Sequence, residues 1–187
     1  MIVEVKTWTR EECQLMLEAG LAGLERYELI GGRLCEKERK GHRYIWALML
    51  LGIWLRGLFG GLNVVQGAAI DVSGEDQPRN EPEPDMIVLR KSIGEYKESI
   101  PPAEILLLVE VSDTRLGFDL TTKGALYARA GIDEYWVMDV PGRRVIVHRG
   151  ASQGRYQTID AYFADEQISP LCAPGASVLV ARLFDEA

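Results

Sequence analysis

An apolar run from Ile105 to Val109 ends directly in Glu110, and this junction constrains the fold more than any other stretch of the chain. A short run of apolar residues is typical of a buried strand. A carboxylate that closes such a run is costly to desolvate unless it is paired, hydrogen-bonded or bound to a cation. We therefore expect a buried sheet in which Glu110 is functional or ion-paired.

Length and composition predict one domain. The chain has 187 residues, of which 47% are hydrophobic, enough for one substantial core and too few for two typical domains. No apolar run approaches the roughly 20 residues that span a bilayer, and acids follow the start where a signal peptide would be basic. We expect a single domain over residues 1–187 that is soluble, cytoplasmic and without a membrane partner. Cys13, Cys35 and Cys172 form no C-x-x-C pair, and we interpret them as reduced.

The net charge of −7 argues against a protein that coats nucleic acid, because nonspecific affinity comes mostly from lysine and arginine at phosphates. It does not exclude a nuclease, since acids can gather at a metal site while a local basic patch meets the backbone. The most basic segment contains Arg33, Lys37, Arg39, Lys40 and Arg43. A solvated charged loop is the alternative interpretation of this segment.

Three helices are expected. Thr9 and Glu12 match a capping box, which predicts a short helix that ends near Gly20 or Gly23. A longer helix is expected over residues 42–59, which are apolar nearly all round, so most of its surface should be buried. Helical spacing also marks residues 118–131, where Gly131 is a plausible C-terminal cap.

Strand patterns fill much of the remaining chain. A hairpin is expected around Gly31-Gly32 and another around Pro141-Gly142, and the proline-rich loop SGEDQPRNEPEP should be irregular and exposed. The predicted strands are residues 27–36 as a hairpin, 63–71, 85–89, 105–112, 134–140 and 143–149. Three strands, a helix and a further strand in succession indicate a mixed α/β sheet.

Two carboxylates are expected to converge on this sheet. Asp85 begins one predicted strand, Glu110 lies near the end of the next, and each shares its face with apolar residues. Such a pair would attract magnesium or manganese, which prefer oxygen ligands. Asp119, Lys123 and Tyr127 recur at helical spacing, so Lys123 could reach the same pocket. Taken singly, Asp85 could start a strand after a turn, and Asp119 and Lys123 could form a surface ion pair.

These elements together resemble a known family. The runs RYELIGGRLCE, PEPDMIVL and LLLVEVSDTRLGFDLTTKGALYARAGIDEYWVMD look like the Uma-two family of restriction-endonuclease-like proteins, which belongs to the PD-(D/E)XK nuclease superfamily. The similarity covers residues 9–184 and is densest over residues 81–140. It implies a single nuclease-like domain with a restriction-endonuclease-like fold, in which helices flank a mixed central sheet.

The resemblance also implies a site. Asp85 matches the PD aspartate and Glu110 the second acid, so both are expected to hold the cation, with the Val111 carbonyl as a further ligand. The plain motif has lysine where this chain has Ser112, and the lysine is instead expected at Lys123. Glu28 matches an N-terminal acid that points toward the metal in many members. The chain departs from the common SPST pattern at residues 112–115, so the geometry of that loop is open.

The implied activity is a metal-dependent endonuclease that hydrolyses phosphodiester bonds in DNA with Mg²⁺ or Mn²⁺. Two other functions stay open: a catalytically silent binding or regulatory protein with the nuclease fold, and a nuclease that acts on RNA or branched DNA. A homodimer is expected because cutting both strands needs two sites or sequential nicking. The apolar run SVLVARLF could form that interface or cap the core.

Several polar and aromatic residues carry weaker expectations. His42 could contact substrate, although a structural hydrogen bond at the helix start is favoured, and His148 is expected to face solvent. Gln66 and Arg79 flank the region before Asp85 and could touch DNA. The remaining aromatic candidates are interpreted as core residues: Tyr127, Tyr135 and Trp136.

Overall fold

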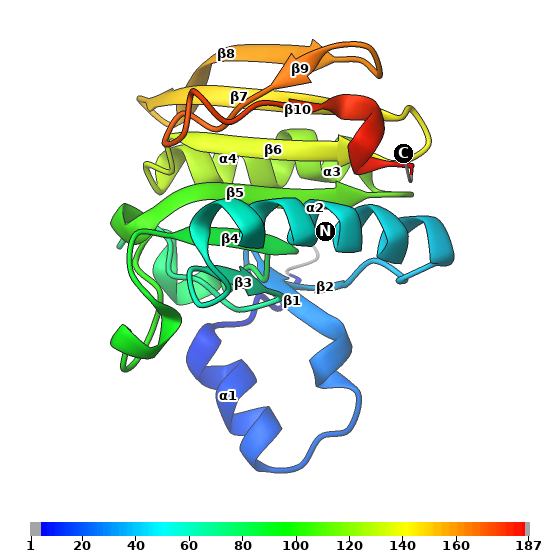
Figure 1. Ribbon diagram of the computed structural model, residues 1–187. Coiled ribbons are helices and arrows are strands. Elements are labelled where there is room, and N and C mark those ends of the chain that lie inside the picture. The colour runs from blue at the N-terminus through cyan, green and yellow to red at the C-terminus, as the bar shows by residue number, and fades with distance from the viewer. Residues whose placement is uncertain (1–4, 186–187) are drawn as a thin grey trace.

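A six-stranded mixed sheet forms the centre of the computed structural model, which describes residues 5–185 (Figure 1). The strands lie in the order β3-β4-β5-β6-β7-β8; β5 and β6 are parallel and every other neighbouring pair is antiparallel. Their bounds are β3 Val64–Gln66, β4 Met86–Leu89, β5 Ile105–Ser112, β6 Glu134–Asp139, β7 Arg144–Ser152 and β8 Arg155–Tyr162. The expected mixed α/β sheet is confirmed.

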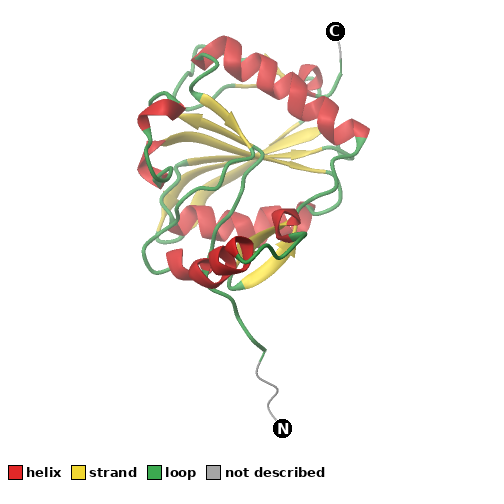
Figure 2. Cartoon of the chain, turned by 90° about the horizontal axis from the view of Figure 1, so that it is seen from below, coloured by secondary structure: helices red, strands yellow, loops and turns green. Residues whose placement is uncertain are grey.

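Helices cover both faces of this sheet, as the view along it shows (Figure 2). On one face lies α2 (His42–Phe59), whose buried residues share a cluster with Leu107 and Val109 of β5. The crossover between β5 and β6 covers the other face with α3 (Leu116–Phe118), a π-helical turn (Asp119–Lys123) and α4 (Gly124–Arg129). Because strand residues alternate, Leu108 and Glu110 point toward the α4 face.

The N-terminal part packs beside the sheet. Thr9 and Glu12 form the expected capping box at the start of α1 (Arg10–Glu18), and the expected hairpin is β1 (Tyr27–Ile30) with β2 (Arg33–Glu36). The hairpin joins the loop before β4 through a bridge between Leu29 and Glu81. This bridge brings Glu28 next to the start of β4. Short 3₁₀ turns cover Leu24–Arg26, Gln77–Arg79, Ile93–Glu95 and Pro102–Glu104.

The C-terminal run closes the core on the α2 side. It contains β9 (Gln167–Ile168), β10 (Val178–Leu179) and a 3₁₀ turn (Val180–Leu183). Val178, Val180, Leu183 and Phe184 are buried in the same cluster as α2. Of the two roles considered for SVLVARLF, the structure shows the one that caps the core. The helices that the structure describes lack the length and apolarity needed to cross a membrane.

Several sequence expectations were wrong in detail. The strand expected over residues 63–71 ends at Gln66, because the chain then turns at Gly67, where φ is +59°. α2 is not buried on most of its surface: Ile53 is 63% exposed, since only one side of the helix meets the sheet. The loop over residues 73–84 is only partly exposed, because Asn80 is buried and donates to Asp76 O at 2.7 Å.

Candidate active site

Asp85 and Glu110 lie side by side where the inner strands β4 and β5 reach one end of the sheet. Antiparallel β4 and β5 pair Met86 with Val109, so the next positions along the two strands are Asp85 and Glu110. The Val111 N–H donates to Asp85 Oδ2 at 2.8 Å, and the Tyr44 hydroxyl of α2 donates to Asp85 Oδ1. Both oxygens of the Asp85 carboxylate are therefore held by donors from neighbouring elements.

Lys123 brings a cation into contact with two of the acids. Its Nζ lies 2.9 Å from Glu110 Oε1 and 2.9 Å from Glu28 Oε2, and the side chains of all three residues are at most 5% exposed. The Tyr127 hydroxyl donates to the same Glu110 oxygen at 2.7 Å. Lys123 ends the π-helical turn, a feature that recurs at functional sites. Asp119, at the start of that turn, is also buried.

Burial and mutual repulsion shift the acidity of the site. Burial, with the charges of Asp85, Asp119 and Glu28, raises the pKa of Glu110 well above its usual range, although Lys123 opposes this. Burial likewise raises the pKa of Asp85, and it raises that of Asp119 to about 6 against the pull of Lys123. Burial alone would lower the pKa of Lys123, yet the surrounding carboxylates raise it. The site thus holds more carboxylate than its own cation neutralises.

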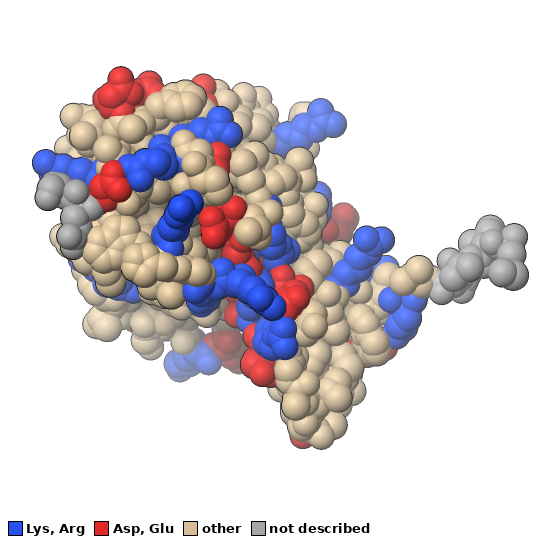
Figure 3. Space-filling view, turned by 90° about the vertical axis from the view of Figure 1, so that its right-hand side faces the viewer, with Lys and Arg blue, Asp and Glu red and all other residues tan. Residues whose placement is uncertain are grey.

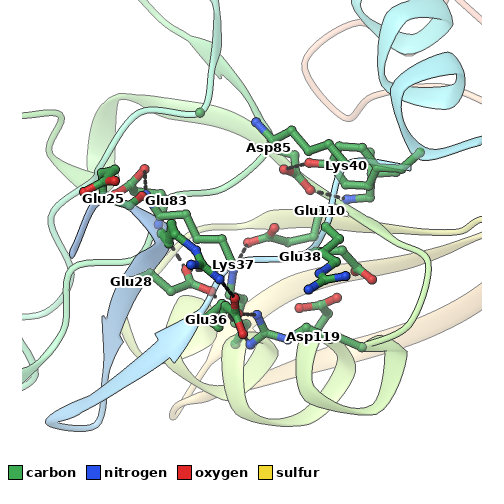
Figure 4. Close-up of a pocket in the computed structure, with 17 residues that line it drawn as sticks. Glu25, Glu28, Glu36, Lys37, Glu38, Lys40, Glu83, Asp85, Glu110 and Asp119 are labelled. Atoms are coloured by element: carbon green, nitrogen blue, oxygen red, sulfur yellow. Dashed lines mark hydrogen bonds and ion pairs between the residues drawn. The ribbon is translucent and has the colours of Figure 1, made fainter. Parts of the chain in front are cut away.

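These groups line a cavity of about 430 Å³ (Figure 4). Eight carboxylates and six basic side chains surround it, so a phosphate would meet an excess of negative charge unless a further cation were present. The acids are Glu25, Glu28, Glu36, Glu38, Glu83, Asp85, Glu110 and Asp119; the bases are Arg26, Lys37, Arg39, Lys40, Arg115 and Lys123. The face that carries this end of the sheet shows lysine and arginine gathered around acidic side chains (Figure 3).

The segment between β2 and α2 forms one wall of the cavity. Glu38 accepts hydrogen bonds from the backbone N–H groups of Asp113 at 3.2 Å and Thr114 at 2.6 Å, which ties this segment to the loop after β5. Lys37 pairs with Glu83 at 2.7 Å. Among the ion pairs of residues 5–185 none involves Arg39 or Lys40, which are both exposed at the cavity mouth.

The structure brings together most of the site residues expected from sequence. Asp85, Glu110, Val111, Lys123 and Glu28 all line the cavity. Ser112, which stands where the plain motif has lysine, is fully buried.

Other sequence candidates lie elsewhere. Gln66 and Arg79 are not among the residues that line this cavity, and His42 lines a neighbouring one. His148 does not face solvent: it is 1% exposed and packs against Tyr135 and Tyr156, because both faces of β7 are covered. That expectation was wrong.

Two hydroxyl groups at the site were missed. Tyr127 is buried as expected of a core aromatic, but its hydroxyl also contacts Glu110. Tyr44 was not considered, although its hydroxyl contacts Asp85. The helical spacing that links Lys123 to Tyr127 could have indicated the first contact. Nothing in the sequence around Tyr44 predicts that α2 lies against the start of β4.

The carboxylates of the site fit a hard divalent cation that takes only a few of its ligands from the protein. No group of three or more candidate ligands converges within residues 5–185, since Glu28 contacts Lys123 rather than Asp85. Mg²⁺ usually needs only one or two carboxylates and keeps several waters. Glu110 Oε2 accepts none of the hydrogen bonds found in the described part of the chain. Asp85 and Glu110 therefore suffice for such an ion.

Comparison with known proteins identifies the family of the chain and agrees with its fold. The model of the Uma2 family, described as "Putative restriction endonuclease", matches residues 11–181. A crystal structure of a "putative nuclease belonging to DUF820" from Anabaena variabilis ATCC 29413 superposes with a TM-score of 0.70 at 14% identity. The match covers 94% of this chain and 97% of that one, so the two share a fold. The search of curated proteins found no match.

Proposed function

The chain belongs to the Uma2 family, and from this premise we propose that it is a divalent-metal-dependent endonuclease that hydrolyses phosphodiester bonds in DNA. One observation carries the proposal: Asp85 and Glu110 meet at one end of the central sheet, next to a buried lysine. Paired carboxylates with an adjacent cation suit phosphoryl chemistry, where charge must be stabilised on phosphate oxygens.

Asp85, Glu110 and the Val111 carbonyl would hold Mg²⁺ or Mn²⁺. When bound, such a cation lowers the pKa of a bound water and stabilises charge on the phosphate. Val111 supports this assignment in a second way, because its N–H fixes the Asp85 carboxylate at 2.8 Å. The two carboxylates are thus held in place before any ligand enters, which limits the reorganisation needed at the reaction.

Lys123 is proposed to carry positive charge to the reacting phosphate and to orient the attacking water. Its pKa is raised by the carboxylates around it, so it stays protonated throughout the physiological range. Glu28 also pairs with Lys123, at 2.9 Å. We therefore propose that Glu28 positions the Lys123 side chain and does not bind the metal ion.

The basic side chains at the cavity mouth are proposed to contact the nucleic-acid backbone. Arg39 and Lys40 are exposed and contribute to none of the ion pairs among residues 5–185, so their charge is available to phosphates. Arg115 lines the same cavity. An enzyme of this kind would act in the cytoplasm, and a homodimer would place two such sites on one duplex.

The proposal is tested by nicking of supercoiled plasmid with added Mg²⁺ or Mn²⁺. Glu110→Gln should lower the rate by about a hundredfold or more while circular dichroism shows that the protein is still folded at the assay temperature, because the amide cannot supply an anionic ligand. Glu25→Gln is the matched control, since Glu25 lines the cavity but is exposed. Equal rates for wild type and Glu110→Gln would remove Glu110 from the site.

Calorimetric titration with the same ions tests metal binding separately. Wild type should bind, and Asp85→Ala and Glu110→Ala should both lose binding. A protein that binds neither ion, with or without DNA, and cleaves nothing would instead be the silent binding protein of the same fold. A panel of single-stranded DNA, branched DNA and RNA distinguishes the remaining substrate classes.

A further inference from the structure

A second, smaller cavity lies beside the carboxylate site. Its volume is about 260 Å³, below the roughly 300–1,000 Å³ of sites that bury drug-sized ligands, so it suits a single flat group. It is formed by the first turn of α2, the turn between β6 and β7, and the C-terminal segment. The lining residues are His42, Arg43, Trp46, Val140, Arg143, Phe184 and Asp185.

The start of α2 separates the two cavities. Lys40 and Tyr44 line the carboxylate site, whereas His42 and Arg43, between them in sequence, line the smaller cavity. The same end of the sheet also links them, because the Val140 N–H donates to Ser112 O at 2.9 Å and Ser112 follows directly on Glu110 and Val111. A nucleic-acid strand with one phosphate at the carboxylate site would therefore have its next nucleotide near the smaller cavity.

The walls of this cavity suit an aromatic ring. The rings of His42 and Trp46 are nearly parallel, at 5° with centroids 6.4 Å apart, and they stand one helical turn from each other. Val140 and Phe184 are buried and give the cavity an apolar floor. Stacking on aromatic side chains is how proteins hold single-stranded bases.

The charges beside the cavity suit a polyanion. The Arg143 guanidinium lies 6.0 Å from the centre of the Phe184 ring and pairs with Asp185. Arg43 is exposed and takes part in none of the ion pairs within the described chain. The cavity thus combines an apolar floor, two parallel rings and the unpaired guanidinium of Arg43. This combination matches a nucleobase with its phosphate better than it matches an apolar peptide.

We propose that this cavity receives one unpaired nucleobase of the strand whose phosphate lies at Asp85 and Glu110. The inference rests on the proposed function and narrows its substrate class to nucleic acid with an unpaired nucleotide next to the cleaved bond. A base inside a duplex is stacked and paired, so it cannot offer its face to Trp46 without leaving the helix.

Binding of fluorescein-labelled 12-nucleotide DNA tests this, with Ca²⁺ as the added divalent cation and electrophoresis to verify that the probe stays intact. Single-stranded DNA should bind Trp46→Ala about 10-fold more weakly than wild type. The blunt duplex of the same sequence should bind both proteins equally. Trp46→Phe should restore most of the affinity. Ile53→Ala, an exposed apolar residue farther along α2, is the matched control and should bind like wild type.

An abasic scan locates the contact. Removal of the base at one position should weaken wild-type binding as much as Trp46→Ala does, and should weaken Trp46→Ala no further. Equal single-strand affinities for wild type and Trp46→Ala, or equal losses on single strand and duplex, would overturn the base pocket alone. Absence of wild-type binding to every probe would instead overturn the proposed nuclease function on which it rests.

Discussion

Lys123 Nζ and Glu110 Oε1 lie 2.9 Å apart in an ion pair that joins the π-helical turn to the central strand β5. Both side chains are 5% exposed. A buried pair of this kind adds little net stability compared with apolar residues, but removal of one partner is costly. Because burying these two charges gains little net free energy of folding, the pair is consistent with a role other than stability.

Lys123→Met should destabilise the fold by about 3–5 kcal/mol at pH 8, because Glu110 then keeps a buried charge without its cation. At pH 5 the loss should be smaller, since the raised pKa of Glu110 allows the folded protein to protonate it. Urea unfolding at the two pH values measures this. Lys97→Met, an exposed lysine, is the control. A loss of equal size at both pH values would contradict the prediction.

Tyr127→Phe should cost about 1.5–3 kcal/mol, because it removes a hydrogen bond of 2.7 Å to a buried carboxylate. Tyr156→Phe is a matched control in the same core: the Tyr156 hydroxyl is buried and has no hydrogen-bond partner among the described residues, so its loss should be neutral or stabilising. Chemical denaturation of both variants makes the comparison. Similar costs for the two substitutions would show that the Glu110 contact contributes nothing specific.

Asp119→Asn should remove a loss of stability that wild type shows as pH rises. The folded pKa of Asp119 is raised to about 6 from an ordinary value of 3.8, so the folded state holds its proton more tightly than the unfolded state. The resulting stability is present below pH 3.8 and lost as pH rises through about 6. As pH rises from 4 to 8, the free energy of unfolding of the variant should therefore increase by about 2 kcal/mol relative to that of wild type.

Thermal or urea unfolding across that range checks the Asp119 prediction. A variant of Asp119 that runs parallel to wild type would place its folded pKa near the ordinary value.

His148→Phe should remove a pH dependence of opposite sign. Burial lowers the pKa of His148 below its ordinary 6.5, so the unfolded state binds the proton more tightly. The stability of wild type therefore contains a contribution that is complete above pH 6.5 and declines as pH falls below it, by up to about 1.4 kcal/mol for each unit. Unfolding from pH 7.5 to pH 5 compares the variant with wild type. A variant whose slope equals that of wild type would contradict this prediction.

Much of the fold follows from local patterns. The capping box of α1, the glycine turn between β1 and β2, and the apolar run of β5 all occur where the sequence predicted them. These features depend on neighbours in the chain, so the sequence states them directly. β8 went unpredicted because its exposed positions alternate weakly with apolar ones, and pairing with β7 rather than burial holds it.

By itself the sequence determined the family to which the chain belongs, and it predicted a site made of two acids at strand ends and a lysine at helical spacing. Only the tertiary structure decided how they are paired. It placed Glu28 on Lys123, the Tyr44 hydroxyl on Asp85 and His148 inside the core. The physical reason is that partners of a buried charge come from whichever elements pack around it, and that packing depends on contacts remote in the chain.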